Sequence, residues 1–320
     1  MFRLLIASLC VALAAPALAQ DYPSRPVKIV FPLAPGGGGD VFSRALADEL
    51  SKLWHQPVLV ENRPGGGQNI GARACAEAAP DGYTICVMSS EPAVYNEFLY
   101  KTIPYNPEKD FQPVANLFFN TLSVVVNSDL KVKSLAELIA LAKSRHETRQ
   151  GLSYATFSFP LTVFMEKLKK KEGIDVVKVP YRGGGDVVNA VLGGTTPIAL
   201  LALSNMVPQI QSGRITLLAV NSNARSPLFP DAPTLKEAYG DDAPPTWFGL
   251  FTPAGVPRPI VEKIARDADR IMAEPAFRKR IYTDRAVEPA LERLDDFARF
   301  IAAERKIARQ IVQDSGEQPK

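Results

Sequence analysis

Histidine, cysteine and unbalanced charge are all scarce in this chain of 320 residues. It contains 2 histidines and 3 cysteines, and its formal net charge is only +3. Charges this evenly balanced give no indication of binding to nucleic acid or to a membrane surface. His55 and His146 stand near no cysteine and no paired carboxylates, so a zinc site or a histidine-based catalytic triad has little to build on.

The common nucleotide and hydrolase motifs are missing as well. No G-x-x-x-x-G-K-[ST] occurs, and the four glycines at 36 to 39 fail the spaced dinucleotide pattern because Val41 stands at its sixth position. Ser89 and Ser90 lack the G-x-S-x-G frame of a hydrolase nucleophile. The sequence therefore predicts a binding protein and not an enzyme, with no cofactor, no metal site and no nucleic-acid partner.

Long apolar runs are absent except at the start of the chain. Arg3 is followed by the apolar run Leu4 to Ala15 and by an A-x-A pattern that ends at Ala19. Cys10 follows a leucine, whereas a lipoprotein cleavage site needs a small residue there. We expect a signal peptide over residues 1–19, cleavage after Ala19 and a mature protein outside the cytoplasm.

The stretch from Val27 to Arg44 holds the strongest binding signal. A short apolar run leads through Pro32 and Pro35 into Gly36, Gly37, Gly38 and Gly39, and Asp40 then opens an amphipathic segment. This order predicts a strand, a loop and a helix. Glycines allow a ligand to approach the backbone, and the free N–H groups of a helix start attract an anion. We favour a ligand loop over a flexible surface loop.

The mature chain alternates short β-branched runs with helical patterns, which favours α/β architecture with largely parallel sheets. Similar glycine loops recur at residues 63–71 and 182–186, and the strand near residues 83–88 ends in Ser89-Ser90-Glu91. Ligands lie at the carboxyl ends of strands in open α/β sheets. We therefore expect these loops to face one crevice.

Two crossings between lobes are predicted from the pattern. Strands near 112–117 and 122–127 lead into a new unit, and a proline-rich stretch over 222–245 leads out of it. We place lobe 1 at residues 20–120 and 243–320 and lobe 2 at residues 121–242. Two α/β lobes joined by two linkers describe a clamp that closes on a small molecule, and we expect a monomer.

The two cysteines of the mature chain leave an alternative open. Cys75 and Cys86 could pair in an oxidising compartment, but both occupy apolar positions, which suits buried free thiols equally well.

Binding groups are more plentiful than catalytic groups. The backbone of the glycine loops, the hydroxyls of Ser89, Ser90 and Ser158, and the guanidinium of Arg182 could together receive a carboxylate. A hydrogen bond to a charged group contributes about 1.5 to 3 kcal/mol. For Arg182, a surface ion pair with Asp186 is an equally good interpretation.

Several long motifs resemble one known family over essentially the whole mature chain. They are Pro32-x-x-Pro35-Gly36-Gly37-x-x-Asp40 with Arg44, Val60-Glu61-Asn62-Arg63-Pro64-Gly65-x-Gly67-x-Asn69-Ile70-Gly71, Ala79-Pro80-Asp81-Gly82-Tyr83-Thr84, Pro180-Tyr181-Arg182-Gly183-Gly184 and Trp247-Phe248-Gly249-Leu250-Phe251-x-Pro253-Ala254-Gly255. In this order they are similar to the Bug family of extracytoplasmic solute receptors, the binding proteins of tripartite tricarboxylate transporters.

The resemblance implies a periplasmic-binding-protein fold of type II, with two α/β lobes, a carboxylate ligand in the cleft between them, and a membrane permease that receives the ligand. It also implies that the loop from Leu33 to Asp40 grips the carboxylate. The ligand-binding residues that we expect are Leu33, Gly36, Gly37, Gly38, Gly39, Asp40, Ser89, Ser90, Phe157, Ser158, Tyr181, Arg182, Gly183 and Leu201.

Departures from the family pattern bear on the ligand. Around Phe157 and Leu201 this chain is apolar and aromatic, and an aspartate that many members carry near Leu201 is absent. We infer a carboxylate with an apolar or aromatic body rather than an amino acid or citrate. Alternatively, Phe157 and Phe159 simply pack the core of the lobe.

Transport is the leading hypothesis for function. A ligand-sensing module that signals to a membrane sensor kinase would need the same clamp, so the sequence does not separate the two. A hydrolase that uses Ser89 or Ser90 is disfavoured because no histidine partner accompanies them.

Overall fold

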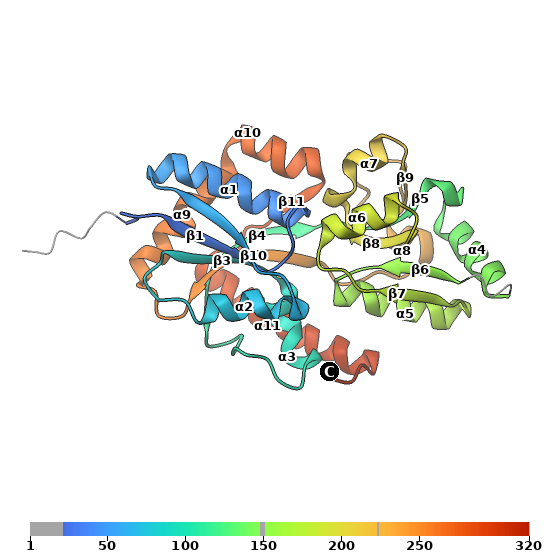
Figure 1. The fold of residues 1–320 in the computed structure, drawn as a ribbon, viewed down its shortest axis with the longest axis horizontal. Helices are drawn as coiled ribbons and strands as arrows, with labels where there is room; N and C mark the ends of the chain where they lie inside the picture. Colours follow the sequence, from blue (N-terminus) through green and yellow to red (C-terminus); the bar gives the residue numbers. More distant parts are fainter. Residues whose placement is uncertain (1–21, 148–150, 223, 320) are drawn as a thin grey trace, which may run out of the picture.

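A computed structural model describes residues 22–147, 151–222 and 224–319 and shows two α/β lobes beside each other (Figure 1). The predicted signal peptide lies outside the described residues. Within the described ranges, no helix is long and apolar enough to cross a membrane. The same ranges contain no group of three or more histidine, cysteine, aspartate or glutamate residues placed to hold a metal ion.

The first lobe is built on a sheet of six strands. In spatial order they are β11 (Val287–Pro289), β4 (Phe111–Asn120), β10 (Thr246–Pro253), β3 (Thr84–Ser89), β1 (Val27–Phe31) and β2 (Val58–Asn62). β1 runs parallel to both of its neighbours, with Ile29 opposite Val60 on one side and Ile85 on the other. The carboxyl ends of β1 and β3 therefore lie at the same edge of the sheet.

The second lobe is built on a sheet of five strands. In spatial order they are β7 (Val176–Val179), β6 (Leu152–Ala155), β8 (Ile198–Ala202), β5 (Leu122–Asn127) and β9 (Ile215–Asn221). β8 is buried at every position, as its unbroken apolar sequence predicts for a strand covered on both faces.

The sheets are mixed, so the prediction of largely parallel sheets was wrong. β10 pairs antiparallel with β3 and β4, and β5 pairs antiparallel with β8 and β9. The reason is the double crossing: β5 follows β4 directly after Thr121, and β10 is the first strand after the chain returns. Each of these strands enters its sheet from the other lobe and runs against its neighbours.

Helices cover both sheets (Figure 1). Those of the first lobe are α1 (Gly38–Trp54), α2 (Asn69–Ala76), α3 (Asn96–Leu99), α9 (Arg258–Ala273), α10 (Pro275–Phe277) and α11 (Leu294–Ser315). Those of the second are α4 (Leu135–Glu147), α5 (Phe159–Glu172), α6 (Gly184–Leu192), α7 (Val207–Gln211) and α8 (Leu235–Tyr239). Single helical turns occur at Gly66–Gln68, Glu91–Tyr95, Ser128–Leu130, Leu203–Asn205, Arg278–Tyr282 and Thr283–Arg285.

The division of strands between the sheets bears on the lobe boundaries. Every strand from residue 122 to 221 belongs to the second sheet, and the strands before and after belong to the first. We propose to keep the boundaries where the sequence analysis put them, at 120/121 and 242/243.

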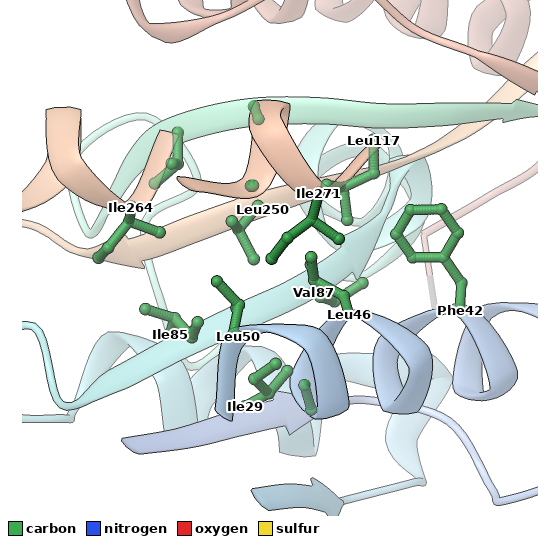
Figure 2. Close-up of a cluster of buried hydrophobic side chains, with 14 of the residues drawn as sticks. Ile29, Phe42, Leu46, Leu50, Ile85, Val87, Leu117, Leu250, Ile264 and Ile271 are labelled. Atoms are coloured by element: carbon green, nitrogen blue, oxygen red, sulfur yellow. The ribbon is translucent and has the colours of Figure 1, made fainter. Parts of the chain in front are cut away.

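One apolar cluster fixes α1 on the first sheet (Figure 2). Phe42, Leu46 and Leu50 recur every four residues and therefore share one face of the helix. They pack in one cluster with Ile29 and Val87 of the sheet. The packing fixes the axis of α1, and with it the position of its amino terminus at the edge of the sheet.

A disulfide joins Cys75 of α2 to Cys86 of β3. Both residues are completely buried. Of the two alternatives that the sequence left open, the structure therefore has the disulfide and not a pair of free thiols.

Candidate functional site

A cavity of about 30 Å³ lies between the two lobes, with walls from both. Eight of the predicted ligand-binding residues line it: Leu33, Gly37, Gly38, Gly39, Ser89, Phe157, Ser158 and Leu201. Gly36, Asp40, Ser90, Tyr181, Arg182 and Gly183 are not among its walls. The remaining wall residues were not predicted from the sequence; they are Phe31, Ala34, Glu91, Asn120, Leu122, Thr156, Leu161, Gly184, Leu200, Ala202, Asn205, Thr246 and Phe248.

Glycine is needed at most positions of this loop because neighbouring groups pack closely against the backbone. Only Gly36 of the four glycines has a positive φ, at 91°. Gly38 and Gly39 already belong to the first turn of α1, where a Cβ on Gly38 would overlap Ser204 Oγ of the second lobe. Left-handed backbone in this loop is thus confined to Gly36, and the other glycines let neighbouring groups come close.

Asp40 holds the loop in shape from behind. Its carboxylate accepts hydrogen bonds from the Gly36 amide at 3.0 Å, from Asn62 Nδ2 at 2.8 Å and from the Arg44 guanidinium at 3.0 and 3.1 Å. Asn62 also donates to the Leu33 carbonyl at 2.9 Å. With its oxygens occupied in this way, Asp40 supports the loop rather than forming a wall of the cavity.

The second lobe contacts this loop directly. Asn205 Oδ1 accepts a hydrogen bond from the Gly38 amide at 2.6 Å. The same oxygen would lie 2.6 Å from a Cβ placed on Gly184, at the start of α6, and a Cβ on Gly183 would lie 3.1 Å from that of Ala34. The predicted glycine loops of the two lobes therefore pack against each other, and Asn205 bridges them.

Three helices begin at the cavity. Gly38 and Gly39 belong to the start of α1, Ser158 precedes α5, and Gly184 opens α6, and all four residues line the walls. The N-cap residues make no side-chain cap hydrogen bond at these helix starts, although Asn205 accepts one from the Gly38 amide of α1. The other first-turn N–H groups and the positive ends of the helix dipoles favour negative charge at this place. In α5, Pro160 has no N–H group and the Phe159 amide faces Glu91.

Most of the remaining wall is apolar. Phe31 and Phe248 of the first lobe are stacked with ring centroids 5.8 Å apart, and Phe157, Leu200 and Leu201 come from the second lobe. Phe157 also packs partly against the cores of both lobes. Both interpretations of Phe157 thus have support, because the same side chain lines the cavity and contributes to packing.

The end of β3 brings a carboxyl group into the cavity. Ser89 Oγ lies 2.6 Å from Glu91 Oε2 and 2.7 Å from Gln68 Oε1, and all three residues are buried. Burial raises the pKa of Glu91, although hydrogen bonds from Ser89 and from backbone amides act in the opposite direction. The triplet Ser89-Ser90-Glu91 was recognised in the sequence as the end of a strand, so its position was a signal for Glu91.

Glu91 changes one inference about the ligand. The sequence argument against a ligand amine was that no acidic residue stands near Leu201. That segment is indeed apolar, but the structure places an acidic residue on the opposite wall. The absence of an acidic residue near Leu201 therefore does not exclude an amine on the ligand.

The other predicted residues lie elsewhere. Tyr181 and Arg182 line a second hollow of about 350 Å³, together with Gly65, Gly66 and Gly67 of the second glycine loop. Arg182 is exposed and forms no ion pair with Asp186 or with any other described residue. Ser90 is fully buried, and its Oγ has no hydrogen-bond partner in the described part of the chain. The second glycine loop thus faces this hollow and not the cavity.

The raised pKa of Glu91 has a consequence for stability. A carboxyl group whose pKa is raised by folding stabilises the protein below its ordinary pKa of about 4.3, and this contribution is lost as the pH rises through the folded pKa. We expect Glu91→Gln to gain free energy of unfolding relative to the wild type as the pH rises from about 4 to 7. Urea unfolding at several pH values measures this difference.

The matched control is Glu77→Gln, which removes a carboxylate that is more than half exposed and lines no part of the cavity. A difference between Glu91→Gln and the wild type that stays constant across this pH range would show that folding leaves the pKa of Glu91 unchanged.

Comparison with known proteins identifies relatives along almost the full chain. A family model described as "Tripartite tricarboxylate transporter family receptor" matches residues 42–316. A UPF0065 protein of Bordetella bronchiseptica is 32% identical over 317 residues, which are 99% of this chain and 93% of the relative. The protein BugT of Bordetella pertussis is 31% identical over 310 residues, or 96% and 94% of the two chains.

Solved structures of other proteins have the same fold as this chain. A protein of Rhodopseudomonas palustris solved with adipate has a TM-score of 0.87 and 27% identity, over 94% of this chain and all of the other. The periplasmic binding protein BugD has a TM-score of 0.85 and 26% identity, over 93% and 100%. The chain therefore belongs to the tripartite tricarboxylate transporter receptor family, a family of two-lobed solute receptors that includes the Bug proteins.

Proposed function

We propose that this protein captures a small carboxylate in the cavity between its lobes and delivers it to the membrane permease of a tripartite tricarboxylate transporter. The observation that carries the proposal is the meeting of three helix starts, those of α1, α5 and α6, at one cavity. Helix starts on both lobes would hold one anion, so the ligand itself would favour the closed arrangement.

The walls favour a carboxylate with an apolar or aromatic body. The described walls around the helix starts include three phenylalanines and five leucines. Relatives have been solved with adipate and with malate, both of which are carboxylates. Burying the carbon chain of such a ligand adds about 0.8 kcal/mol for each CH₂ group.

Entry of the ligand requires the lobes to separate. The cavity is smaller than a ligand of several carbons, and both crossings of the chain lie beside it, with Asn120, Leu122 and Thr246 among its walls. We infer that rotation about these two crossings opens the cleft, as in other two-lobed binding proteins.

The wider assignments follow from the same proposal. We infer export to the periplasm by the leader over residues 1–19, with cleavage after Ala19, and action as a monomer without enzymatic turnover. A ligand-sensing module that signals to a membrane sensor kinase is the alternative, because it would use the same cavity. A deletion strain that loses uptake of the ligand would support transport, whereas one that keeps uptake but loses ligand-induced transcription would support signalling.

A ligand panel tests the proposal directly. The panel contains aliphatic and aromatic monocarboxylates, dicarboxylates such as adipate and malate, citrate, amino acids and neutral sugars. A true ligand at 100 times its dissociation constant should add about 2.7 kcal/mol to the free energy of unfolding, which a thermal-shift assay detects. Stabilisation by sugars alone, or by no member of the panel, would contradict the proposal. Stabilisation by citrate alone would contradict only the inference that the ligand has an apolar or aromatic body.

Gly38→Ala tests whether closure needs the glycine loop. The added methyl would overlap Ser204 Oγ and hold the lobes apart. We expect a larger radius of gyration in small-angle X-ray scattering with the stabilising carboxylate, and an affinity at least about tenfold weaker, or 1.4 kcal/mol. Gly151→Ala is the control, because a Cβ there would meet nothing within 4 Å. Equal affinities for the two variants would argue against the close contact.

A further inference from the structure

Among the described residues, Glu91 is the one acidic side chain in the wall of the cavity. It is 6% exposed, and its Oε1 atom has no hydrogen-bond partner in the described part of the chain. A buried polar atom without a partner costs free energy, so a group that supplies the missing hydrogen bond is favoured at this place. Glu91 also lines the second hollow, so it lies where the cavity meets that space.

The neighbours of Glu91 offer it hydrogen bonds but no positive charge. Ser89 Oγ contacts its Oε2 atom. The Gln68 side chain, the amide of Glu91 itself and the Phe159 amide of the second lobe also offer hydrogen bonds to the carboxyl group. The nearby Tyr95 is a buried phenol. Among the described residues, Glu91 belongs to no ion pair. A buried carboxylate without a cation is unfavourable, and a cation from outside would relieve this cost.

The wall formed by the second lobe also contains a buried polar atom without a described hydrogen-bond partner. Ser158 is 6% exposed, lines the cavity from the second lobe, and its Oγ has no described hydrogen-bond partner. A hydroxyl group can accept a hydrogen bond as well as donate one. Glu91 and Ser158 thus provide two free acceptors on facing lobes, beside the helix starts that favour an anion.

We propose that Glu91, with Ser158, binds an ammonium group of the ligand, so that the cavity selects a carboxylate that also carries an amine. An ammonium has three N–H donors and carries a full positive charge, which no side chain among the described wall residues supplies. A second carboxylate at the same place would be repelled by an ionised Glu91. The inference rests on the proposed function, since the carboxylate of the same ligand occupies the starts of α1 and α6.

Ligands that share six carbons and differ in one group test the inference by isothermal titration calorimetry. The set is hexanoate, 6-hydroxyhexanoate, norleucine, 6-aminohexanoate and adipate. Relative to hexanoate, the others add a hydroxyl group, an amine at one of two positions, or a second carboxylate. In the wild type we expect at least one of the two amines to bind at least about tenfold more tightly than hexanoate. Glu91→Gln should abolish this advantage and leave hexanoate unaffected or bound more tightly.

Glu77→Gln is the matched control and should keep the preference for the amine. Circular dichroism and thermal unfolding establish that Glu91→Gln is folded. An amine advantage that survives Glu91→Gln, or a preference for adipate or for the hydroxy acid over both amines, overturns the inference while the proposed function stands. If no member of the set binds and the wider panel yields no carboxylate, the proposed function fails and the inference fails with it.

Discussion

The close approach of two glycine loops is the contact on which the cavity depends. The Gly38 amide of the first lobe donates a hydrogen bond to Asn205. A Cβ on Gly38 would overlap Ser204 Oγ, and a Cβ on Gly184 would overlap Asn205 Oδ1. This contact brings the starts of α1 and α6 to the same place. Without it, each helix start would be an isolated and weak anion site in water, where a charge near a helix end gains only about 0.3 to 1 kcal/mol.

The two lobes contribute different chemistry to the cavity. The first provides the start of α1 and the buried pair of Ser89 and Glu91, and the second provides the starts of α5 and α6 with an apolar wall. A ligand that touches both lobes stabilises the closed arrangement by the difference in its contacts between the open and closed forms. The anion site and the carboxyl group of Glu91 therefore contact the same ligand together only in the closed form.

Local patterns predicted most of the architecture. The apolar periodicity of α1 and the β-branched run of β5 gave elements close to those observed, because each pattern reports burial on one or both faces. The direction of β5 and β10 was not predicted, because it depends on which lobe the chain comes from. The short β11 was also missed, since three residues carry no periodic signal.

The site was predicted in part for similar reasons. Leu33, Gly37 and Ser89 follow the carboxyl ends of strands, so chain order alone brings them to the cavity. Asn205 and Phe248 reach the same cavity through contacts between segments far apart in the sequence, which no local pattern reports. Tyr181 and Arg182 carry a family motif, but they line the neighbouring hollow instead.

A crystal structure of the protein with a stabilising carboxylate tests the central claim most directly. The account predicts the carboxylate oxygens within about 2.7 to 3.0 Å of backbone N–H groups in the first turn of α1, between the two lobes. A carboxylate bound instead to Arg182 in the second hollow, with the helix starts left to solvent, would contradict it.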